Sequence, residues 1–526
     1  MASLTAWQIS LISLACILVG LYLLYRLLLI YAVSLYKKTV KGNAVNVDEW
    51  VNDPNPSPQS CLKAMILHKF NSYGFKGSPS TVKLDPIPSD KVEGLIVTKE
   101  LDSEKTIDNG NTKTPPLVVG TIRMGFGHHR IAYAATSWGI GADGDRETYF
   151  HDLLNIKSPE AKMIHDMDQK YSRGSRIASE IGGIAESIWG SLTKSGDEDS
   201  IRAFYQLGEL LKPILMGLDK NSPIVATHSF VAYTAVACGF KNVINLVIDN
   251  HAQWFVVVPR ALNLVQGPSN YHNLLKMGVP SDELQLAGHW IPKDLVEGIP
   301  DICQKRIERA NSNPRKPLRI LIPVGGAGAQ RKFVTSLVRA LAPYVKQSQV
   351  QLFLNAGDHK HMETAFIQAL NDSGLLSFDK VTDMAGVRAF KDSLMNGAEP
   401  DKPVTLFTYT DYFTAVATTD ILCNVADVLA CKPSELAFYP IPKLMIRRVG
   451  DHEAYSALRA SELGDGTLEA RTLDVCLRYV DLFLEAELLT SMNEAIIKNN
   501  SIGVYDGCKN AIRIALERAN AMNQNK

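Results

Sequence analysis

The chain has 526 residues, of which 46% are hydrophobic and 21% are charged. This composition is typical of a globular protein and excludes a disordered chain and a polytopic membrane protein. Lysine plus arginine and aspartate plus glutamate both total 55, so no basic excess indicates a nucleic-acid partner.

The length exceeds that of one ordinary core and predicts two domains with appendages. The eight cysteines are scattered and form no C-x-x-C pair. This pattern favours reduced thiols in a cytosolic compartment over a disulfide framework or a zinc site.

The first predicted element is a membrane anchor at residues 1–36. Nineteen residues without a charge, 7–25, are enough to span a bilayer as a helix. Lysines follow at 37, 38 and 41, so the positive-inside rule places the bulk of the chain in the cytoplasm. A cleaved signal peptide is the alternative, but the segment is too long for one and lacks a basic region before it.

Residues 37–116 predict a linker or extension without recognisable chemistry. It contains a turn cluster at 53–58, an amphipathic piece at 61–70 and a candidate strand at 94–98.

From residue 117 to 310, short apolar runs alternate with helical stretches, which is typical of βαβ units and a parallel sheet. The spacing predicts strands at 117–122, 224–227, 243–248 and 254–258, and a helix over 201–218.

A second α/β region, 317–470, begins in the same way, with a strand at 318–324, a glycine turn and a helix over 332–345. Further strands are predicted at 350–355, 404–407, 420–423 and 443–446. The tail, 471–526, has the pattern of amphipathic helices.

These two regions predict an α/β fold of two doubly wound, Rossmann-like domains that face a cleft, preceded by a transmembrane helix. Ligands of such sheets bind beyond the carboxyl ends of the strands, where both glycine turns lie. Neither turn is a complete G-x-G-x-x-G or Walker A sequence, which disfavours a dinucleotide or P-loop site.

The turn at 125–130 carries the clearest candidate chemistry. Gly125 and Gly127 let the backbone approach a ligand closely, and the helix that follows favours an anion. His128 or His129 would take a proton from a bound hydroxyl near neutral pH. From these residues alone, an ordinary tight turn with solvent-facing histidines is an equally good interpretation.

Four segments, in order over about 117–460, resemble the GT-B glycosyltransferases that include monogalactosyldiacylglycerol synthases and the bacterial peptidoglycan N-acetylglucosaminyl transferase. Residues 125–130 are similar to the family's glycine loop ending in His-Arg, with Phe126 in place of a glycine. Residues 249–255 are similar to its Asp…His-Pro-Thr-Trp-Phe segment, 325–330 to its donor-domain glycine loop, and 420–453 to its donor-binding segment.

The resemblance implies an acceptor-side domain at 117–310, a donor-binding domain at 317–470 and closing helices that pack back on the first domain. It implies that His128 or His129 is the catalytic base and that Glu435 holds donor hydroxyls, with Asp451 and Glu453 on the sugar. Without the resemblance, Glu435 reads as the first turn of a helix capped by Ser434. The acceptor-side or phosphate-loop residues are Gly125, Gly127, Arg130, His251 and Trp254; the donor-binding residues are Gly325, Gly326, Gly328, Gln330, Lys432, Pro433, Ser434, Glu435, Asp451, His452 and Glu453.

His251 and Trp254 have two interpretations, because both fit a buried core as well as an acceptor site. No metal is predicted: residues 143–145 read as a turn and 358–361 as an exposed loop. Backbone N–H groups of the second glycine turn would hold the diphosphate instead.

The leading hypothesis is a membrane-anchored hexosyltransferase that uses no cofactor, takes a nucleotide sugar, expected to be a UDP sugar, and serves a lipid or membrane-proximal acceptor. Two alternatives stay open: a catalytically silent binding or scaffold protein, and a nucleotide-sugar epimerase or hydrolase of the same fold.

Overall fold

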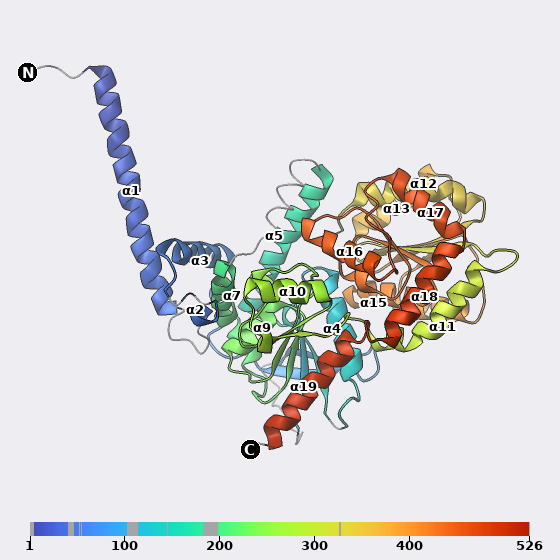
Figure 1. Cartoon of the computed structure of the whole chain (residues 1–526), viewed down its shortest axis with the longest axis horizontal. Helices are drawn as coiled ribbons and strands as arrows, with labels where there is room; N and C mark the ends of the chain where they lie inside the picture. Colours follow the sequence, from blue (N-terminus) through green and yellow to red (C-terminus); the bar gives the residue numbers. More distant parts are fainter. Residues whose placement is uncertain are drawn as a thin grey trace, which may run out of the picture.

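A computed structural model describes residues 5–39, 47–51, 53, 55–101, 114–144, 146–181, 198–325 and 328–524. Lys41, Asp145 and Gly326, which the sequence singled out, lie outside these residues. Figure 1 shows one long helix standing away from two α/β units, each built on its own sheet.

The first unit holds an eight-stranded sheet of order β1-β2-β4-β3-β5-β6-β7-β8. All neighbouring strands are parallel except β1 and β2. Its strands are β1 (Leu84–Pro88), β2 (Ile96–Glu100), β3 (Leu117–Thr121), β4 (Thr148–Asp152), β5 (Ile224–Ala226), β6 (Val243–Leu246), β7 (Leu262–Val265) and β8 (Leu284–Leu286). Thus β1 and β2, from the region expected to be a linker, extend this sheet at its edge.

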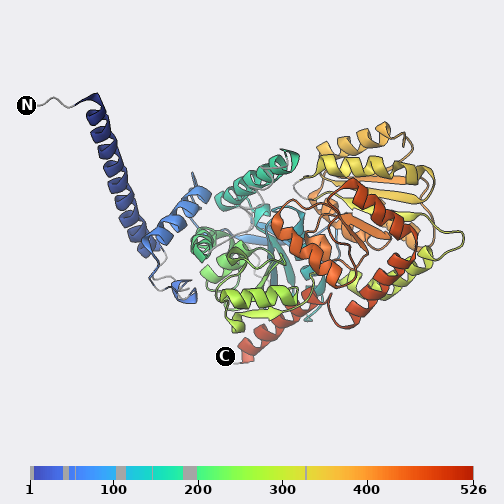
Figure 2. The same ribbon diagram turned by 45° about the horizontal axis from the view of Figure 1, so that its top comes forward.

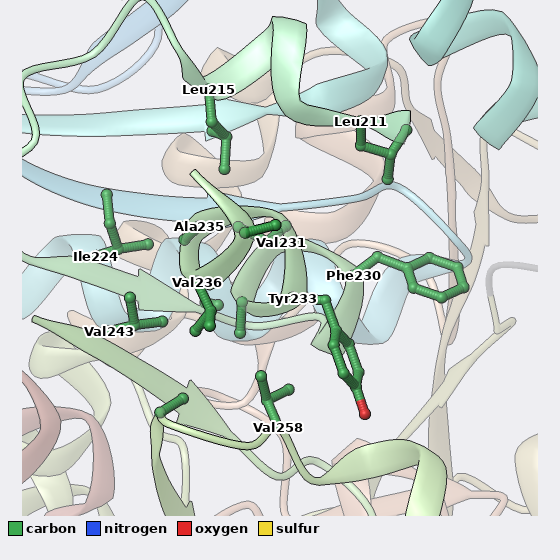
Figure 3. Packing of buried hydrophobic residues seen from close by; sticks show 14 of the residues in the cluster. Leu211, Leu215, Ile224, Phe230, Val231, Tyr233, Ala235, Val236, Val243 and Val258 are labelled. Atoms are coloured by element: carbon green, nitrogen blue, oxygen red, sulfur yellow. The ribbon is translucent and has the colours of Figure 1, made fainter. Parts of the chain in front are cut away.

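Helices cover the first sheet because its central strands are buried on both faces and present apolar side chains to each side. They are α4 (Phe126–Gly139), α5 (Pro159–Ile181), α7 (Glu198–Leu210), α8 (Lys212–Leu215), α9 (Ser229–Ala237) and α10 (Pro268–Met277), with 3-10 turns η1 (Leu153–Asn155), η2 (Trp254–Val256) and η3 (Ser281–Glu283). Figure 3 shows side chains of α9 meeting Ile224 of β5 and Val243 of β6.

The second unit holds a six-stranded parallel sheet of order β11-β12-β10-β9-β13-β14. Its strands are β9 (Leu318–Pro323), β10 (Val350–Gly357), β11 (Asp379–Val381), β12 (Val404–Thr408), β13 (Val428–Cys431) and β14 (Lys443–Met445). Its helices are α12 (Arg331–Lys346), α13 (Lys360–Asp372), α14 (Met384–Met395), α15 (Tyr412–Leu422) and α16 (Ala454–Glu462), with 3-10 turns η4 (Glu435–Phe438) and η5 (Asp451–Glu453).

Each sheet reverses its winding once, and this reversal sets where a ligand can bind. In the first sheet the chain passes from β3 to β4 on one side and later to β5 on the other. In the second sheet β9 leads to β10 on one side and, later, β13 pairs with its other edge. Open α/β sheets bind ligands beyond the carboxyl ends of the strands at such switch points. Both glycine turns lie there, because one follows β3 and the other follows β9.

Two predicted strands are wrong. Residues 254–258 start with the 3-10 turn η2. The backbone groups of the two buried valines that follow form hydrogen bonds with side chains and not with a neighbouring strand. The Tyr233 hydroxyl donates to the Val257 carbonyl at 2.8 Å, and the Val258 N–H donates to Asn263 Oδ1 at 2.8 Å. Figure 3 shows Val258 beside Tyr233 in this core.

Residues 420–423 lie at the end of helix α15 and do not form the predicted strand. The Asp411 carboxylate caps this helix by accepting from the Thr414 N–H at 2.9 Å. A short apolar run does not distinguish a buried strand from a buried helix, and here the capped helix extends through the run.

The amino-terminal helix α1 (Ala6–Thr39) projects away from both units (Figures 1 and 2). Its segment Leu11–Lys38 is long and apolar enough to cross a membrane, a property that a signal sequence shares. At its base, α1 packs against α3 (Pro58–Asn71), next to the short helix α2 (Val47–Trp50).

The carboxy-terminal helices divide between the two units. The helix α17 (Leu473–Leu484) packs on α12, and α18 (Glu487–Ser501) packs on α11 (Lys293–Ala310). Only α19 (Gly507–Gln524) returns to the first unit, where it lies against α4, β5 and β6 (Figure 1).

A buried ion pair ties the end of the second sheet to this tail. Lys443 Nζ lies 2.7 Å from Asp465 Oδ1, and both side chains are fully buried. The Tyr505 hydroxyl, between α18 and α19, donates to Asp465 Oδ2 at 2.7 Å. The tail is therefore anchored through a charge that has no access to water.

Replacing Lys443 with methionine should destabilise the second unit by about 3–5 kcal/mol, because Asp465 would keep its burial and lose its cation. A thermal melt of the full chain measures this as a large fall in Tm. The matched control is Lys360→Met, since that lysine is 83% exposed in its ion pair and should contribute about 1 kcal/mol or less. Equal effects of the two substitutions would contradict the prediction.

Candidate functional site

The first switch point brings together the ends of β3 and β5. Gly125 has φ 77°, a left-handed conformation that glycine adopts without strain, and it directly precedes helix α4. The helix starts at Phe126, so the two histidines of the turn lie within its first turns. Thr227 and His228 follow the end of β5 and immediately precede α9.

His128 is held in one orientation by the end of β5. Its Nδ1 lies 2.6 Å from the carbonyl oxygen of Thr227, which can only accept, so Nδ1 carries the proton and Nε2 keeps a lone pair. The Thr227 hydroxyl donates in return to the His128 carbonyl at 3.0 Å. Burial lowers the pKa of His128, while the Thr227 carbonyl and the carboxylates of Asp249 and Glu435 pull it upward. The ring is thus neutral, with two carboxylates close enough to raise its pKa.

His228 stands against His128, with the ring centroids 4.4 Å apart. Its Nδ1 accepts from the Phe230 N–H at 3.1 Å, so the proton of the neutral ring lies on Nε2. Burial, and then the charge of a protonated His128, lower the pKa of His228 far below its usual value. The sequence analysis missed this residue, although its place just after a predicted strand was a usable signal.

His129 has a different environment from His128. It is 5% exposed, and its ring packs edge-on against Phe150 and Tyr412 with centroids 5.0 Å apart in each case. Among the described residues, neither ring nitrogen has a hydrogen-bond partner. Burial, helped by Arg123 and Arg130, lowers its pKa to about 3. The ring therefore packs between the units as a neutral aromatic group.

Arg130 crosses into the second unit. Its buried guanidinium forms an ion pair with Asp420 of α15 and donates to the Val416 carbonyl at 3.1 Å. Its Nε also lies 3.6 Å from Glu435. Burial disfavours the charge, but Asp420, Tyr439 and Glu435 outweigh it and raise the pKa of Arg130. This arginine is thus a structural connection that remains charged.

Phe126, which replaces a glycine of the resembled loop, is inserted into the second unit and is 2% exposed. Its ring stacks on His359 at a centroid distance of 5.5 Å and meets the edge of Tyr412 at 5.3 Å. The absence of a side chain at Gly357 provides the space for this ring, because a Cβ there would lie 3.1 Å from it. The Tyr412 hydroxyl donates to the Gly125 carbonyl at 2.6 Å, which completes the junction.

The second switch point lies between the ends of β9 and β13. Gly328 and Gln330 have φ values of 60° and 64°, and Gln330 immediately precedes α12. The side chain of Gln330 is used in the fold, because its Nε2 donates to the Arg447 carbonyl. Lys432, just after β13, approaches this turn: a Cβ on Gly325 would lie 3.4 Å from its Cε.

The segment 358–361, expected to be an exposed loop, holds the second glycine turn in place. His359 Nε2 lies 3.2 Å from the Gly325 carbonyl, and His361 Nε2 lies 3.3 Å from the Gly328 carbonyl. Since carbonyls only accept, both histidines donate through Nε2. Lys360 and His361 are exposed as predicted, but they begin helix α13 and are not in a loop. The half-buried His359 reaches the glycine turn because the end of β10 lies beside that of β9, a neighbour relation that only the sheet establishes.

Glu435 joins the two switch points. It opens η4, and its carboxylate lies over the first glycine turn, where a Cβ on Gly127 would be 3.1 Å from Oε2. This close approach requires the glycine. Ser434 makes no side-chain cap in the described structure, and Pro433 is buried beside it.

The side chains of residues 451–453 contact other residues of the chain. The buried Glu453 carboxylate forms an ion pair with Lys432, whose side chain is 30% exposed, and accepts from the Val449 N–H at 2.7 Å. Asp451 accepts from the Arg448 guanidinium at 3.1 and 3.2 Å. His452 lies against Gly450 within the same turn. Glu453 thus holds Lys432 toward the second glycine turn.

His251 and Trp254 lie in different parts of the structure. His251 stacks on Tyr455 of the second unit, with centroids 4.4 Å apart and the rings 16° from parallel. Trp254 packs on the first core and meets Trp50 edge-on at 6.1 Å. The structure therefore places His251 at the junction of the units and Trp254 beside the amino-terminal segment.

Among the described residues, no group of three or more His, Cys, Asp or Glu side chains is arranged to hold a metal ion. The functional groups at the two switch points are the neutral imidazole of His128, the imidazole of His228, the carboxylate of Glu435 and the ammonium group of Lys432.

Residues 61–275 match the model of a domain of unknown function, DUF6937, and residues 279–516 match that of a second, DUF6938. No curated protein matches the chain.

Solved structures with a remote likeness include the following three. WaaG, a glycosyltransferase involved in lipopolysaccharide biosynthesis, is 14% identical with a TM-score of 0.31; the match covers 49% of this chain and 63%, just under two thirds, of WaaG. MurG of Acinetobacter baumannii is 13% identical over 77% of this chain and 100% of MurG, with a TM-score of 0.35. The UDP-GlcNAc 2-epimerase of Neisseria meningitidis is 11% identical over 76% of this chain and 100% of its own, with a TM-score of 0.37.

The buried His129 should make stability depend on pH. Since folding lowers its pKa from 6.5 to about 3, protonation favours the unfolded chain, and stability is lost as pH falls below 6.5. At pH 5 the loss amounts to about 2 kcal/mol. His129→Phe should remove this share of the loss, measured as a smaller fall in Tm from pH 7 to pH 5. The exposed His272, changed to phenylalanine, is the control and should leave the wild-type pH dependence intact.

Proposed function

We propose that this protein is a membrane-anchored glycosyltransferase that moves a hexosyl group from a nucleoside-diphosphate sugar to a lipid or membrane-proximal acceptor. The observation that carries the proposal is the convergence of two switch points, where Glu435 of the donor-side unit lies on Gly127 beside His128. Family resemblance of the four sequence segments supports the same reaction class.

His128 acts as the base in this proposal. Its Nε2 lone pair takes the proton of the acceptor hydroxyl, while Thr227 fixes the ring through Nδ1. The acceptor oxygen forms a bond to the anomeric carbon, and the bond from that carbon to the phosphate oxygen breaks. The nucleoside diphosphate leaves with the electron pair.

The second glycine turn receives the leaving diphosphate. The amino-terminal end of α12, where the helix dipole is positive, favours an anion there. Lys432 adds a positive charge beside Gly325, and Glu453 keeps that lysine in place. Glu435 holds donor hydroxyls at the junction, between the diphosphate and the base.

The proposal is tested by incubating the purified full chain with UDP and GDP sugars and membrane lipids, and analysing the lipids by mass spectrometry. A hexosylated lipid is expected. Absence of transfer, of donor hydrolysis and of nucleotide binding would contradict it, whereas hydrolysis or epimerisation of the donor without transfer would favour the alternative enzyme.

Replacing His128 with asparagine should lower the transfer rate about 10²- to 10⁴-fold, because the amide keeps a donor for the Thr227 carbonyl but cannot take a proton. His129→Phe is the matched comparison and should keep most of the activity, since that ring only packs between the units. An unchanged rate in His128→Asn, with an unchanged fold by circular dichroism, would support a protein that is catalytically silent or uses another base.

Replacing Lys432 with methionine should weaken nucleoside-diphosphate binding about tenfold, equivalent to ~1.4 kcal/mol, because one cation beside the second glycine turn is lost. Isothermal titration with UDP and GDP measures this. Glu453→Gln should weaken binding in the same direction, since it releases the lysine. Lys360→Met, an exposed lysine at the start of α13, is the control. Unchanged affinity in Lys432→Met would place the diphosphate elsewhere.

A further inference from the structure

We propose that helix α3 is a second membrane contact, which lies at the surface of the bilayer and binds anionic lipid headgroups at the base of the anchor. The inference rests on the membrane anchoring within the proposed function. It adds a surface, a lipid class and a fixed orientation of the enzyme.

The depth of α3 follows from the length of α1. About 20 helical residues cross the hydrocarbon core of a bilayer. Counted from Leu11, where the candidate span begins, the core ends near residue 30. The contact between α1 and α3 lies just beyond that point, because Ala32 and Tyr36 of α1 share a buried cluster with Cys61 of α3. The helix α3 therefore lies at headgroup level.

The direction of α3 is that of an in-plane helix. It crosses the base of α1 and does not continue along it (Figures 1 and 2). Its inner face packs on α1 and on α7 of the first unit through Cys61 and Ala64. Its outer face is exposed.

The outer face combines cations with an apolar side chain. Lys63, Ile66 and Lys69 are exposed and follow each other at intervals of three residues, which aligns them on one side of the helix. Ile66 is 55% exposed, and Tyr73, shortly after the helix, is 91% exposed. Lysines flanking exposed apolar and aromatic side chains are the pattern of helices that bind anionic membrane surfaces.

Further lysines among the described residues lie around this face. Lys37 and Lys38, exposed in the last turn of α1, and Lys76, after α3, add to the two lysines of the helix. Two nearby carboxylates bind Arg202 of α7, Asp48 at 3.1 Å and Asp53 at 2.8 Å, and the guanidinium offsets one of their two negative charges.

The same arginine fixes the orientation of the anchor. The Tyr36 hydroxyl of α1 donates to Asp48, which Arg202 binds from α7, and the guanidinium is 1% exposed. The base of the anchor is thus joined to the first sheet through a buried polar network. A rigid joint here holds the outer face of α3 against the bilayer.

The test uses the full chain in lipid nanodiscs, with Cys16, the exposed native thiol, replaced by serine. An environment-sensitive fluorophore is attached at Ile66→Cys. We expect quenching by lipids with a nitroxide on the headgroup, stronger in phosphatidylglycerol than in phosphatidylcholine. Lys69→Glu combined with Lys76→Glu should reduce it. The control is Leu376→Cys, 73% exposed on the second unit, which should remain unquenched.

A third probe separates this inference from the anchor itself. Val19 is 57% exposed in the middle of α1, and a probe at Val19→Cys should be quenched by a nitroxide deep in the acyl chain. If that probe is quenched while the one at position 66 matches the control, the second membrane contact is wrong and the anchor stands. If both lipids quench position 66 equally, the preference for anionic headgroups is wrong. If the probe at Val19→Cys is not quenched, both the membrane anchor and the second membrane contact are wrong.

Discussion

The buried ion pair between Arg130 and Asp420 joins the two units directly behind the first glycine turn. Removing one partner of such a pair leaves an uncompensated buried charge, so the contact tolerates little rearrangement. Phe126 and His128 lie on the same helix as Arg130, within about one turn before it. One desolvated contact therefore sets the position of the candidate base relative to the second unit.

The candidate site is a product of topology more than of any single motif. Each sheet reverses its winding beside a glycine turn, and Glu435 extends from one reversal to the other. Backbone hydrogen bonds from neighbouring strand ends then orient the side chains, as Thr227 does for His128 and as His359 does for the second turn. The polar groups are held before any ligand arrives, which is the arrangement that electrostatic stabilisation of a reaction requires.

Sequence reasoning located both glycine turns and most strands, because buried parallel strands are continuous apolar runs followed by turn residues. It failed at 254–258 and 420–423, where the predicted strands are a 3-10 turn followed by two buried valines and the end of a buried helix. It missed His228 and the role of the histidines at 359 and 361, since their partners lie on strands distant in the sequence. Hydrophobic periodicity reports burial, and it contains no information on which carbonyl lies opposite a ring.

The residue pattern alone predicts two α/β regions of parallel strands, an apolar amino-terminal helix and a glycine turn bearing two histidines. The different surroundings of the two histidines come from the fold and could not be predicted from the pattern. His128 meets a carbonyl at the end of β5, whereas His129 is enclosed by aromatic rings, although the two are adjacent in the chain. Successive residues of a helix point about 100° apart, so neighbours face different surroundings, and those surroundings come from other parts of the fold.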